Sequence, residues 1–339
     1  MKPGIYLNMP EDTYHAIDAL GSTSIKALFD DATEYKWDRD HPDDDRSSAA
    51  MTLGSAIHKR ILEGREAFEA AYYVKLDPAP WIEKGALNTV DDFKAWLRER
   101  GLGVTGVKDK LKERVREEDA KQLILDEVVA DHAAENEGKE LLTEIQWVRV
   151  CEAAEWCQQD AMLSKFMEDG TFVLGLTEVS VIAEIDGVPV KARFDMLGNH
   201  MILDLKSFAP FMNKDPVMAI PYHIRKMGYL LQAGHYLNLW QEAKKLYAAG
   251  QVFGSHPEGF FDKVFERELP TWVWLFVKTV GAPQPYVREL HRESTARVYA
   301  QRDALEAILF YRQKVEKYGL DKPWPPHNRP VSLGDEELL

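Results

Sequence analysis

Three carboxylates and one lysine lie close together in the segment from residue 178 to residue 206. Glu178 and Asp195 are followed by Asp204 and Lys206, which are two positions apart. Because side chains alternate between the faces of a strand, Asp204 and Lys206 share a face if this segment is a strand. Like charges facing each other across strands destabilise a sheet. A hard divalent cation such as Mg²⁺ would compensate them, and the lysine could orient an attacking water.

Two predicted turns bring these residues together. The Asp-Gly pair at residues 186–187 is a strong hairpin signal, because a two-residue type I′ turn needs positive φ at both central positions. Counting outward from this turn places Glu178 opposite Asp195, and a second turn then returns the chain so that Asp204 lies beside Asp195. The apolar run before Asp204 favours a central strand. The alternative is a solvent-facing sheet surface that carries acids, which the spacing alone does not exclude.

The ordered set of polar residues resembles the core of the PD-(D/E)XK nucleases in their RecB-like form, and most closely the RecE-type (exonuclease VIII) branch. The matching positions are His58, Glu178, Asp195, Asp204-Leu205-Lys206 and Gln232-x-x-x-Tyr236. The N-terminal part also resembles that branch, at Gly4-Ile5-Tyr6, Met9-Pro10, Tyr14-His15 and the run from Ser22 to Leu28. The resemblance extends from about residue 4 to Trp324-Pro325.

This resemblance implies a role for each matching residue. It implies a Mg²⁺ site, with Mn²⁺ also accepted, whose ligands are the side chains of His58, Asp195 and Asp204 and the carbonyl of Leu205. It also implies four catalytic residues, namely Glu178, Lys206, Gln232 and Tyr236. Among these, Lys206 would orient or activate the water, and Tyr236 would contact the substrate backbone. Without the resemblance, a lone histidine beside an apolar helix stripe is more often a packed or surface residue.

Composition limits the class of protein. A chain of 339 residues with 45% hydrophobic residues is ordinary for a globular protein. Since the sequence has no run of about 18 apolar residues and no signal-peptide core at its N-terminus, we expect a soluble, cytoplasmic protein with no membrane partner. Only Cys151 and Cys157 are present, too few for a four-cysteine iron–sulfur cluster. The net charge of −14 argues against binding nucleic acid unless an acidic exterior surrounds a basic channel.

Residues 76–118 look like an insert. A proline-containing break at residues 77–80 precedes two short predicted helices, and these resemble a SAP or helix–extension–helix DNA-binding unit. Between residues 94 and 116, eight Lys or Arg residues stand against three acids. The local surplus of positive charge predicts a phosphate-facing helix formed by Lys108, Lys110, Lys112, Arg114 and Arg116. The alternative is a solvated helical hairpin.

The predicted fold class is α/β, with a mixed central sheet flanked by helices and a small helical insert. The predicted parts are an N-terminal part of the nuclease domain (1–75), the insert (76–118), the nuclease core (119–325) and an acidic tail (326–339). Helices are expected over residues 22–37 and 223–247. Three prolines predict a loop over residues 208–221.

The expected activity is that of a Mg²⁺-dependent exonuclease. By resemblance, its substrate is a double-stranded DNA end resected 5′ to 3′ during recombination, its partner is a single-strand annealing protein, and it assembles as a homo-oligomeric ring. Two alternatives stay open. An endonuclease with the same core would cut closed circular DNA, whereas a DNA-binding module that has lost catalysis would release no nucleotides from linear duplex.

Overall fold

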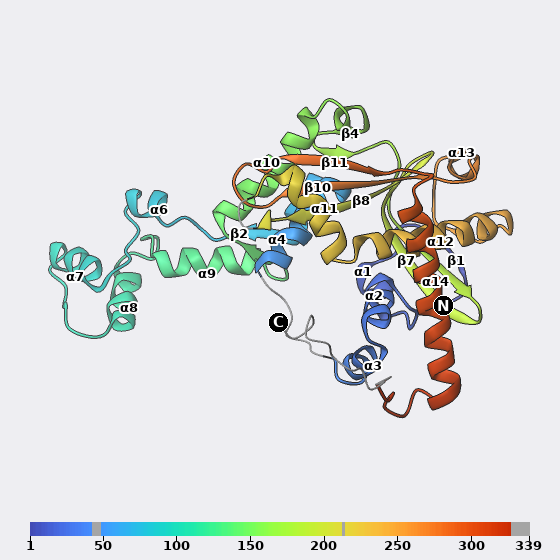
Figure 1. Cartoon of the computed structure of the whole chain (residues 1–339). Coiled ribbons are helices and arrows are strands. Elements are labelled where there is room, and N and C mark those ends of the chain that lie inside the picture. Colours follow the sequence, from blue (N-terminus) through green and yellow to red (C-terminus); the bar gives the residue numbers. More distant parts are fainter. Residues whose placement is uncertain (43–48, 212–213, 327–339) are drawn as a thin grey trace, which may run out of the picture. The chain divides into compact units, whose positions relative to one another are not determined.

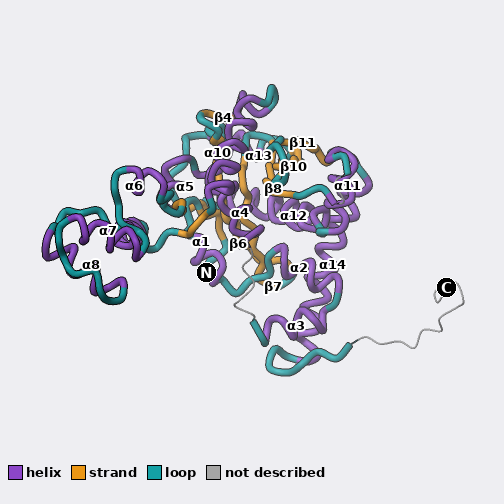
Figure 2. Tube along the Cα trace, turned by 90° about the vertical axis from the view of Figure 1, so that its left-hand side faces the viewer, coloured by secondary structure: helices purple, strands orange, loops and turns teal. Residues whose placement is uncertain are grey.

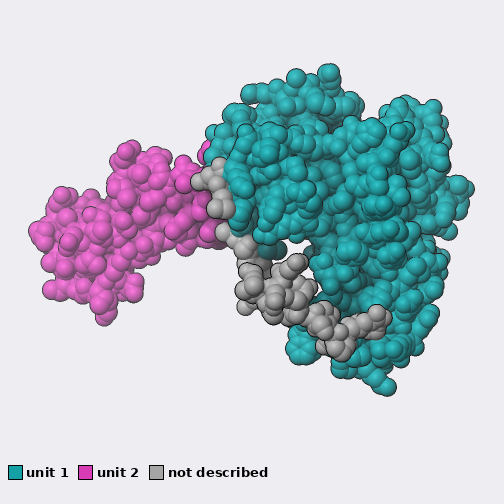
Figure 3. Space-filling view, viewed as in Figure 1, with its two compact units in different colours: residues 1–65, 150–339 teal, residues 66–149 magenta. Residues whose placement is uncertain are grey.

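The structure, a computed structural model, describes residues 1–42, 49–211 and 214–326. The chain divides into two compact units (Figure 3), one formed by residues 1–65 and 150–339 and the other by residues 66–149. The second unit contains the predicted insert, residues 76–118, and is longer at both ends. All but the first residue of the predicted acidic tail, 326–339, lies outside the described residues.

A mixed sheet forms the centre of the first unit (Figure 1). Among the described residues it has seven strands in the order β11-β10-β8-β7-β6-β1-β9. The pairs β10–β8 and β1–β9 are parallel, and the others are antiparallel. This sheet, flanked by helices, confirms the predicted fold class. The strands are β1 (Gly4–Tyr6), β6 (Leu176–Ile185), β7 (Val188–Leu197), β8 (Met201–Phe208), β9 (Val252–Phe253), β10 (Thr271–Lys278) and β11 (Pro285–Leu290).

The predicted hairpin between β6 and β7 is present. Asp186 and Gly187 have φ of 51° and 77°. Positive φ at both central residues is what a tight turn needs if its twist is to match the right-handed twist of the flanking strands. The register has Ile185 facing Val188, and Thr177–Met196 and Val179–Phe194 paired further along. The position between these last two pairs is Glu178 opposite Asp195, so the predicted register is confirmed.

Helices before and after the three central strands complete the first unit (Figures 1 and 2). Those before the strands are α1 (Glu11–Ala16), α2 (Ser22–Asp30), α3 (Ala32–Asp40), α4 (Ala49–His58) and a π-helix (Lys59–Glu63). Those after the strands are α11 (Pro216–Lys226), α12 (Tyr229–Ala248), α13 (Phe260–Phe265) and α14 (Thr295–Tyr318). Helices α5 (Arg65–Ala71) and α10 (Glu144–Gln159) connect to the second unit, and a 3₁₀ turn (Leu163–Phe166) with the short strands β4 (Met167–Glu168) and β5 (Thr171–Phe172) precedes β6.

Helix α12 lies in the core, between the sheet and α14. Its residues Ala233, Leu237 and Trp240 belong to the same buried cluster as strand residues and as Ala304 of α14. The two helices cross very closely, because a Cβ atom on Gly234 would lie 2.2 Å from the carbonyl oxygen of Ala300. A glycine at this position therefore sets how deeply α12 can lie, and α12 carries one of the polar residues of the site described below.

A buried lysine fixes the N-terminal segment to the sheet. The Lys191 ammonium of β7 donates to the carbonyls of Tyr14, His15 and Ile17, at 2.9, 3.1 and 2.8 Å. These carbonyls end α1, where helix geometry leaves acceptors without intrahelical partners and where positive charge is favourable. Lys191 thereby holds residues 14–17 next to β7.

The second unit has its own small core. It contains β2 (Tyr72–Val74), α6 (Ala79–Glu83), α7 (Val90–Glu99), α8 (Lys108–Glu118), α9 (Leu125–Glu135) and β3 (Glu140–Leu142), with β2 and β3 parallel. Its buried cluster is Leu87, Phe93, Trp96, Leu97, Leu111, Val115 and Ile124. Helix α7 begins with a capping box, in which Thr89 accepts from the Asp92 amide and Asp92 accepts from the Thr89 amide.

Three predicted elements are wrong in their boundaries. The helix predicted over 223–247 is two helices, since α11 ends at Lys226 and Gly228, in a left-handed conformation, precedes α12. The helix predicted over 22–37 is two helices, since Asp31 has an extended backbone and its carboxylate caps α3 by accepting from the amides of Thr33 and Glu34. The segment 208–221 is not all loop, because α11 begins at Pro216. Proline is well suited to a first helical position, where its missing N–H is not needed. No described helix has both the length and the apolar composition of a membrane-spanning segment.

The buried His235 of α12 predicts a pH-dependent stability. Its Nε2–H donates to the Lys191 carbonyl at 3.0 Å, and burial lowers the pKa of the ring from 6.5 to about 4. Below pH 6.5 the unfolded chain therefore binds a proton that the folded chain does not, so the free energy of unfolding falls as pH decreases towards 4. A pKa difference of this size corresponds to roughly 3 kcal/mol.

Denaturant unfolding of wild type and His235→Gln between pH 4 and pH 7, with EDTA present, tests this prediction. Glutamine keeps a donor for Lys191 but does not titrate, so the variant should lose less stability than the wild type over this pH range. Equal losses in both proteins would show that His235 does not contribute.

Candidate active site

The carboxylates of Asp195 and Asp204 meet where β7 and β8 separate. The two strands pair at Met196–Leu203 and Leu197–Ile202. Beside these pairs, the Asp195 carboxylate accepts a hydrogen bond from the Leu205 amide at 2.6 Å. Oδ2 of Asp195 thus accepts a hydrogen bond from a backbone N–H of β8, and this bond holds Asp195 directly beside the strand that carries Asp204 and Lys206.

The strands are irregular at the same place. Phe194 and Leu197 of β7 are three residues apart, yet both belong to the core cluster that contains α12. Simple alternation is therefore interrupted at residues 195–196. Opposite them, Glu178 has φ of 56°, a left-handed conformation that is uncommon for a residue with a side chain. Interruptions of this kind redirect side chains near functional sites.

Asp204 is the most deeply buried acid of this group, with 1% of its side chain exposed. Its Oδ2 lies 2.7 Å from the Lys206 ammonium, and its Oδ1 accepts from the Gln232 amide of α12 at 2.9 Å. The structure therefore brings together Asp204, Lys206 and Gln232, three of the residues predicted from the sequence. A buried carboxylate of this kind is costly unless cations and donors surround it.

His58 reaches the same group from the last residue of α4. Its Nδ1 lies 3.9 Å from Oδ2 of Asp195, and its ring is hydrogen-bonded to the backbone of Leu205. Helix α4 approaches β8 closely at Gly54, where a Cβ atom would lie 2.9 Å from the Ser207 hydroxyl. The backbone changes to a π-helix directly after His58, a feature that is frequent at functional sites.

Glu178 forms an ion pair with Arg193 of β7, and Arg193 also donates to the Met9 carbonyl at 2.8 Å. Sequence reasoning missed Arg193, although its position two residues before Asp195 was a usable signal. It also missed Tyr229, whose ring centre lies 5.2 Å from the Lys206 ammonium. A cation near an aromatic ring is attracted by the ring quadrupole, so Tyr229 helps to hold Lys206.

Tyr236 lies in the hydrophobic core and only 7% of it is exposed. Its ring packs edge-on against Phe194 and Trp272. It shares a helix face with Gln232, as predicted from their spacing, but the structure does not bring it to an exposed surface. The predicted contact between Tyr236 and the substrate backbone stays a prediction.

Burial sets the electrostatics of the acids. Burial raises the pKa of Asp204, and Asp195 adds to this rise while Lys206 opposes it. Burial also raises the pKa of Asp195 and of Glu178. It lowers the pKa of His58, and the nearby Lys206 charge lowers it further. Burial would lower the pKa of Lys206, but the carboxylates beside it more than offset this and the pKa is raised. The raised pKa values of the carboxylates and of Lys206 favour positive charge beside the acids, whereas the lowered pKa of His58 favours the neutral ring, which is the form that binds a metal.

The donor set fits a divalent cation. Oδ2 of Asp204 is buried, and its partner within the described residues is the Lys206 ammonium at 2.7 Å. Oxygen donors from two carboxylates and a carbonyl, with one imidazole, suit Mg²⁺ or Mn²⁺. Within the described residues, no three His, Cys, Asp or Glu side chains are already arranged around a common metal position; Lys206 and the Leu205 amide contact the two carboxylates instead.

The basic residues of the second unit are engaged within that unit. Lys108 pairs with Asp126 at 2.7 Å and Lys112 with Glu127 at 3.2 Å, both on α9. Arg114 donates to the carbonyls of Gly103 and Thr105, and Arg116 to Glu127 and to the carbonyls of Ala120 and Gln122. Of the five predicted DNA-binding residues, Lys110 is exposed and the other four are half-buried. The five cations thus do not form one free face, and DNA binding through them stays a prediction.

Together, the sheet and the Asp-x-Lys group define a protein of the PD-(D/E)XK superfamily. Residues 22–253 match the family model described as a PDDEXK-like domain of unknown function, DUF3799. Since the match spans more than half of the chain, the chain belongs to this family.

Two solved structures are similar to the chain at low sequence identity. The crystal structure of a "Putative exonuclease" from Eubacterium rectale has 12% identity and a TM-score of 0.46, with 96% of this chain and 97% of that chain covered. The crystal structure of SSO0001 has 14% identity and a TM-score of 0.21, with 39% of this chain and 48% of that chain covered. No curated protein matches the sequence.

The contacts of Arg116 predict that it stabilises the second unit. Arg116→Ala removes a charged donor from Glu127 and from two carbonyls, so the free energy of unfolding of the second unit should fall by about 1–2 kcal/mol. Lys110→Ala is the matched control on the same helix and should change stability by less than about 0.5 kcal/mol. Amide hydrogen exchange of residues 87–127 measures the stability of the second unit in the two variants. Equal protection in the two variants would contradict this role of Arg116.

Proposed function

We propose that the protein is a divalent-metal-dependent DNA exonuclease of the RecE type. One observation carries the proposal: Asp195, Asp204 and Lys206 are gathered beside Gln232 at a break in the central sheet. This arrangement combines acid ligands, one cation and an amide in a small space. Hydrolysis of a phosphodiester is very slow without help, and metal ions with a positioned water are a common physical solution.

Asp195, Asp204, His58 and the Leu205 carbonyl would hold the metal, Mg²⁺ or Mn²⁺. When bound, such an ion polarises the phosphate and makes a coordinated water more acidic. Gln232 keeps Oδ1 of Asp204 in place, so the carboxylate presents Oδ2. In the reaction, the water loses a proton as its oxygen bonds to phosphorus, the bond from phosphorus to the leaving oxygen breaks, and the leaving oxygen takes up a proton. The Lys206 ammonium lies where it can orient the water and stabilise the negative charge that develops.

The proposal has further parts: a substrate with double-stranded ends, 5′ to 3′ polarity, a role in recombination, a single-strand annealing protein as partner and assembly as a ring. They rest on the resemblance to RecE-type nucleases. The PD-(D/E)XK superfamily generally uses divalent metals, which supports the metal requirement. A comparison of linear duplex with relaxed closed-circular DNA in Mg²⁺ separates the proposed exonuclease from an endonuclease, because only an endonuclease cuts the circle.

Replacing the central acid should abolish cleavage. Asp204→Asn keeps an acceptor for Gln232 but removes the charge that would hold the metal, so nucleotide release from linear duplex should fall by roughly 100-fold or more. Asp186→Asn makes the same chemical change in the β6–β7 turn, where asparagine tolerates positive φ, and should retain activity. Release by Asp204→Asn within tenfold of wild type, from a folded protein, would contradict the proposed site.

A further inference from the structure

A second lysine lies beside the candidate active site. Lys26 of α2 is half-buried, and its ammonium lies 6.0 Å from the centre of the Tyr229 ring. Lys206 approaches the same ring to 5.2 Å. Burial lowers the pKa of Lys26, and the Lys206 charge lowers it further. The two cations are therefore close enough to act on one strand of a polyanion.

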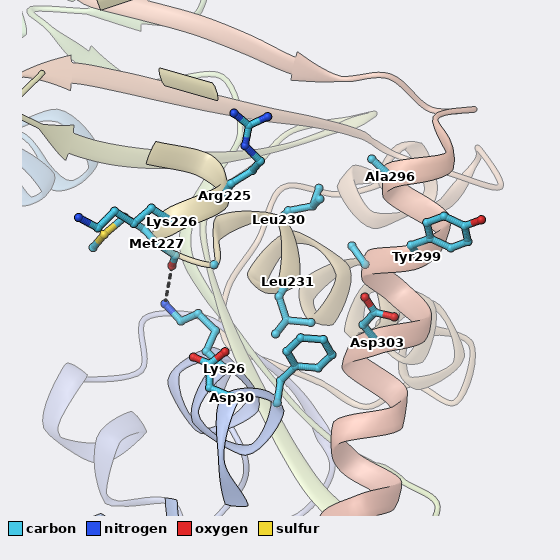
Figure 4. Close-up of a pocket in the computed structure, with 13 residues that line it drawn as sticks. Lys26, Asp30, Arg225, Lys226, Met227, Leu230, Leu231, Ala296, Tyr299 and Asp303 are labelled. Carbon is cyan, nitrogen blue, oxygen red and sulfur yellow. Dashed lines mark hydrogen bonds between the residues drawn. The ribbon is translucent and has the colours of Figure 1, made fainter. Parts of the chain in front are cut away.

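The position of Lys26 is determined by a glycine. Gly228 has φ of 63°, and a Cβ atom there would lie 2.8 Å from Cδ of Lys26. The aliphatic part of Lys26 thus packs on the junction between α11 and α12. Its ammonium is directed at the Met227 carbonyl, 3.5 Å away (Figure 4). A side chain held in this way loses less conformational freedom when it binds a ligand.

Lys206 and Lys26 differ in their partners. Lys206 is paired with Asp204 at 2.7 Å. Within the described part of the chain, Lys26 forms no ion pair, and its one hydrogen bond is the long contact with Met227. The charges of Asp204 and Asp30 raise the pKa of Lys26, but a partly desolvated ammonium without an ion-pair partner at contact distance still favours an anionic ligand.

Lys26 opens onto a groove of about 660 Å³ between α2, α12 and α14. Apolar residues Leu230 and Leu231 line it, together with Phe29, half of whose surface is exposed. Lys26 and Phe29 are three residues apart and therefore neighbours on the same face of α2. Two acids lie at the groove. Asp303 accepts from Arg302 at 2.7 Å, so that charge is compensated, whereas Asp30 forms no ion pair with Lys26 among the described residues and acts on it only at longer range, by raising its pKa.

A cation next to an exposed aromatic ring is the combination that binds single-stranded nucleic acid, in which the phosphate meets the cation and the base stacks on the ring. We propose that Lys26 binds a phosphate of an unpaired strand, adjacent along that strand to the phosphate that is cut. Phe29 would stack on a base of the same strand. This inference rests on the proposed function, and it names a single-stranded segment of the substrate as the ligand of the groove.

Binding of a single-stranded oligonucleotide in EDTA, where the proposed cleavage does not occur, tests the phosphate contact. For Lys26→Met, the slope of log K against log salt should fall by about 0.7, as expected for one lost contact with a single strand. Lys226→Met is the matched control. It lines the same groove, but its ammonium extends away from Lys26 (Figure 4) and lies over the rings of Phe211 and Tyr222. An unchanged slope in Lys26→Met, or an equal fall in Lys226→Met, would overturn the proposal.

Phe29→Ala tests the stacking contact and should weaken single-strand binding by about tenfold, whereas Phe29→Trp should restore it. Failure of tryptophan to restore binding would mean that Phe29 has only a packing role, and the groove would lose its proposed ligand. Wild-type protein that neither binds nor cuts DNA would refute the proposed function itself. Wild-type cleavage combined with normal binding by Lys26→Met and Phe29→Ala would refute only this inference.

Discussion

The arrangement of the first unit depends on the buried ion pair between Asp204 and Lys206. An acid at 1% exposure is strongly unfavourable in a protein interior unless it is compensated. Here the compensation comes from Lys206 on the same strand and from Gln232 on α12. Because α12 is packed closely against α14 at Gly234, the position of Gln232 is set by the packing of the core.

Close backbone approaches bring the outer parts of the site to this pair. Gly54 allows α4 to lie against Ser207, which places His58 near Asp195. Gly228 allows Lys26 to lie against the start of α12. Both glycines are distant from β8 in sequence, yet each determines which charged or polar side chain can reach the neighbourhood of Asp204. Larger side chains at these positions would displace those groups without changing any charge.

Local patterns were sufficient to predict the strands β6, β7 and β8 and the register of β6 with β7. The Asp-Gly turn determines which residues of β6 and β7 face each other, so the opposition of Glu178 and Asp195 could be counted from the sequence. The interruption of alternation at residues 195–196 could not, because it depends on how β8 pairs with β7 and on the hydrogen bond from the Leu205 amide. Arg193 was likewise missed, since its partner Glu178 turns towards it only through an unusual backbone conformation.

The basic helix of the second unit illustrates another limit of sequence reasoning. Its lysines and arginines have the spacing of a phosphate-binding face, but the acids that neutralise them, Asp126 and Glu127, come from the following helix. A count of charge within one helix cannot include such partners. The prolines of 208–221 were misleading for a related reason, because a proline that begins a helix and one that breaks it look the same without the surrounding chain.

Calorimetric titration of Mn²⁺ into metal-free protein shows whether the buried acids form a metal site held in place by Lys206 and Gln232. We expect saturable binding by wild type and its loss in Asp204→Asn, with Asp186→Asn binding as wild type does. Binding of equal affinity and stoichiometry in wild type and Asp204→Asn would contradict this expectation.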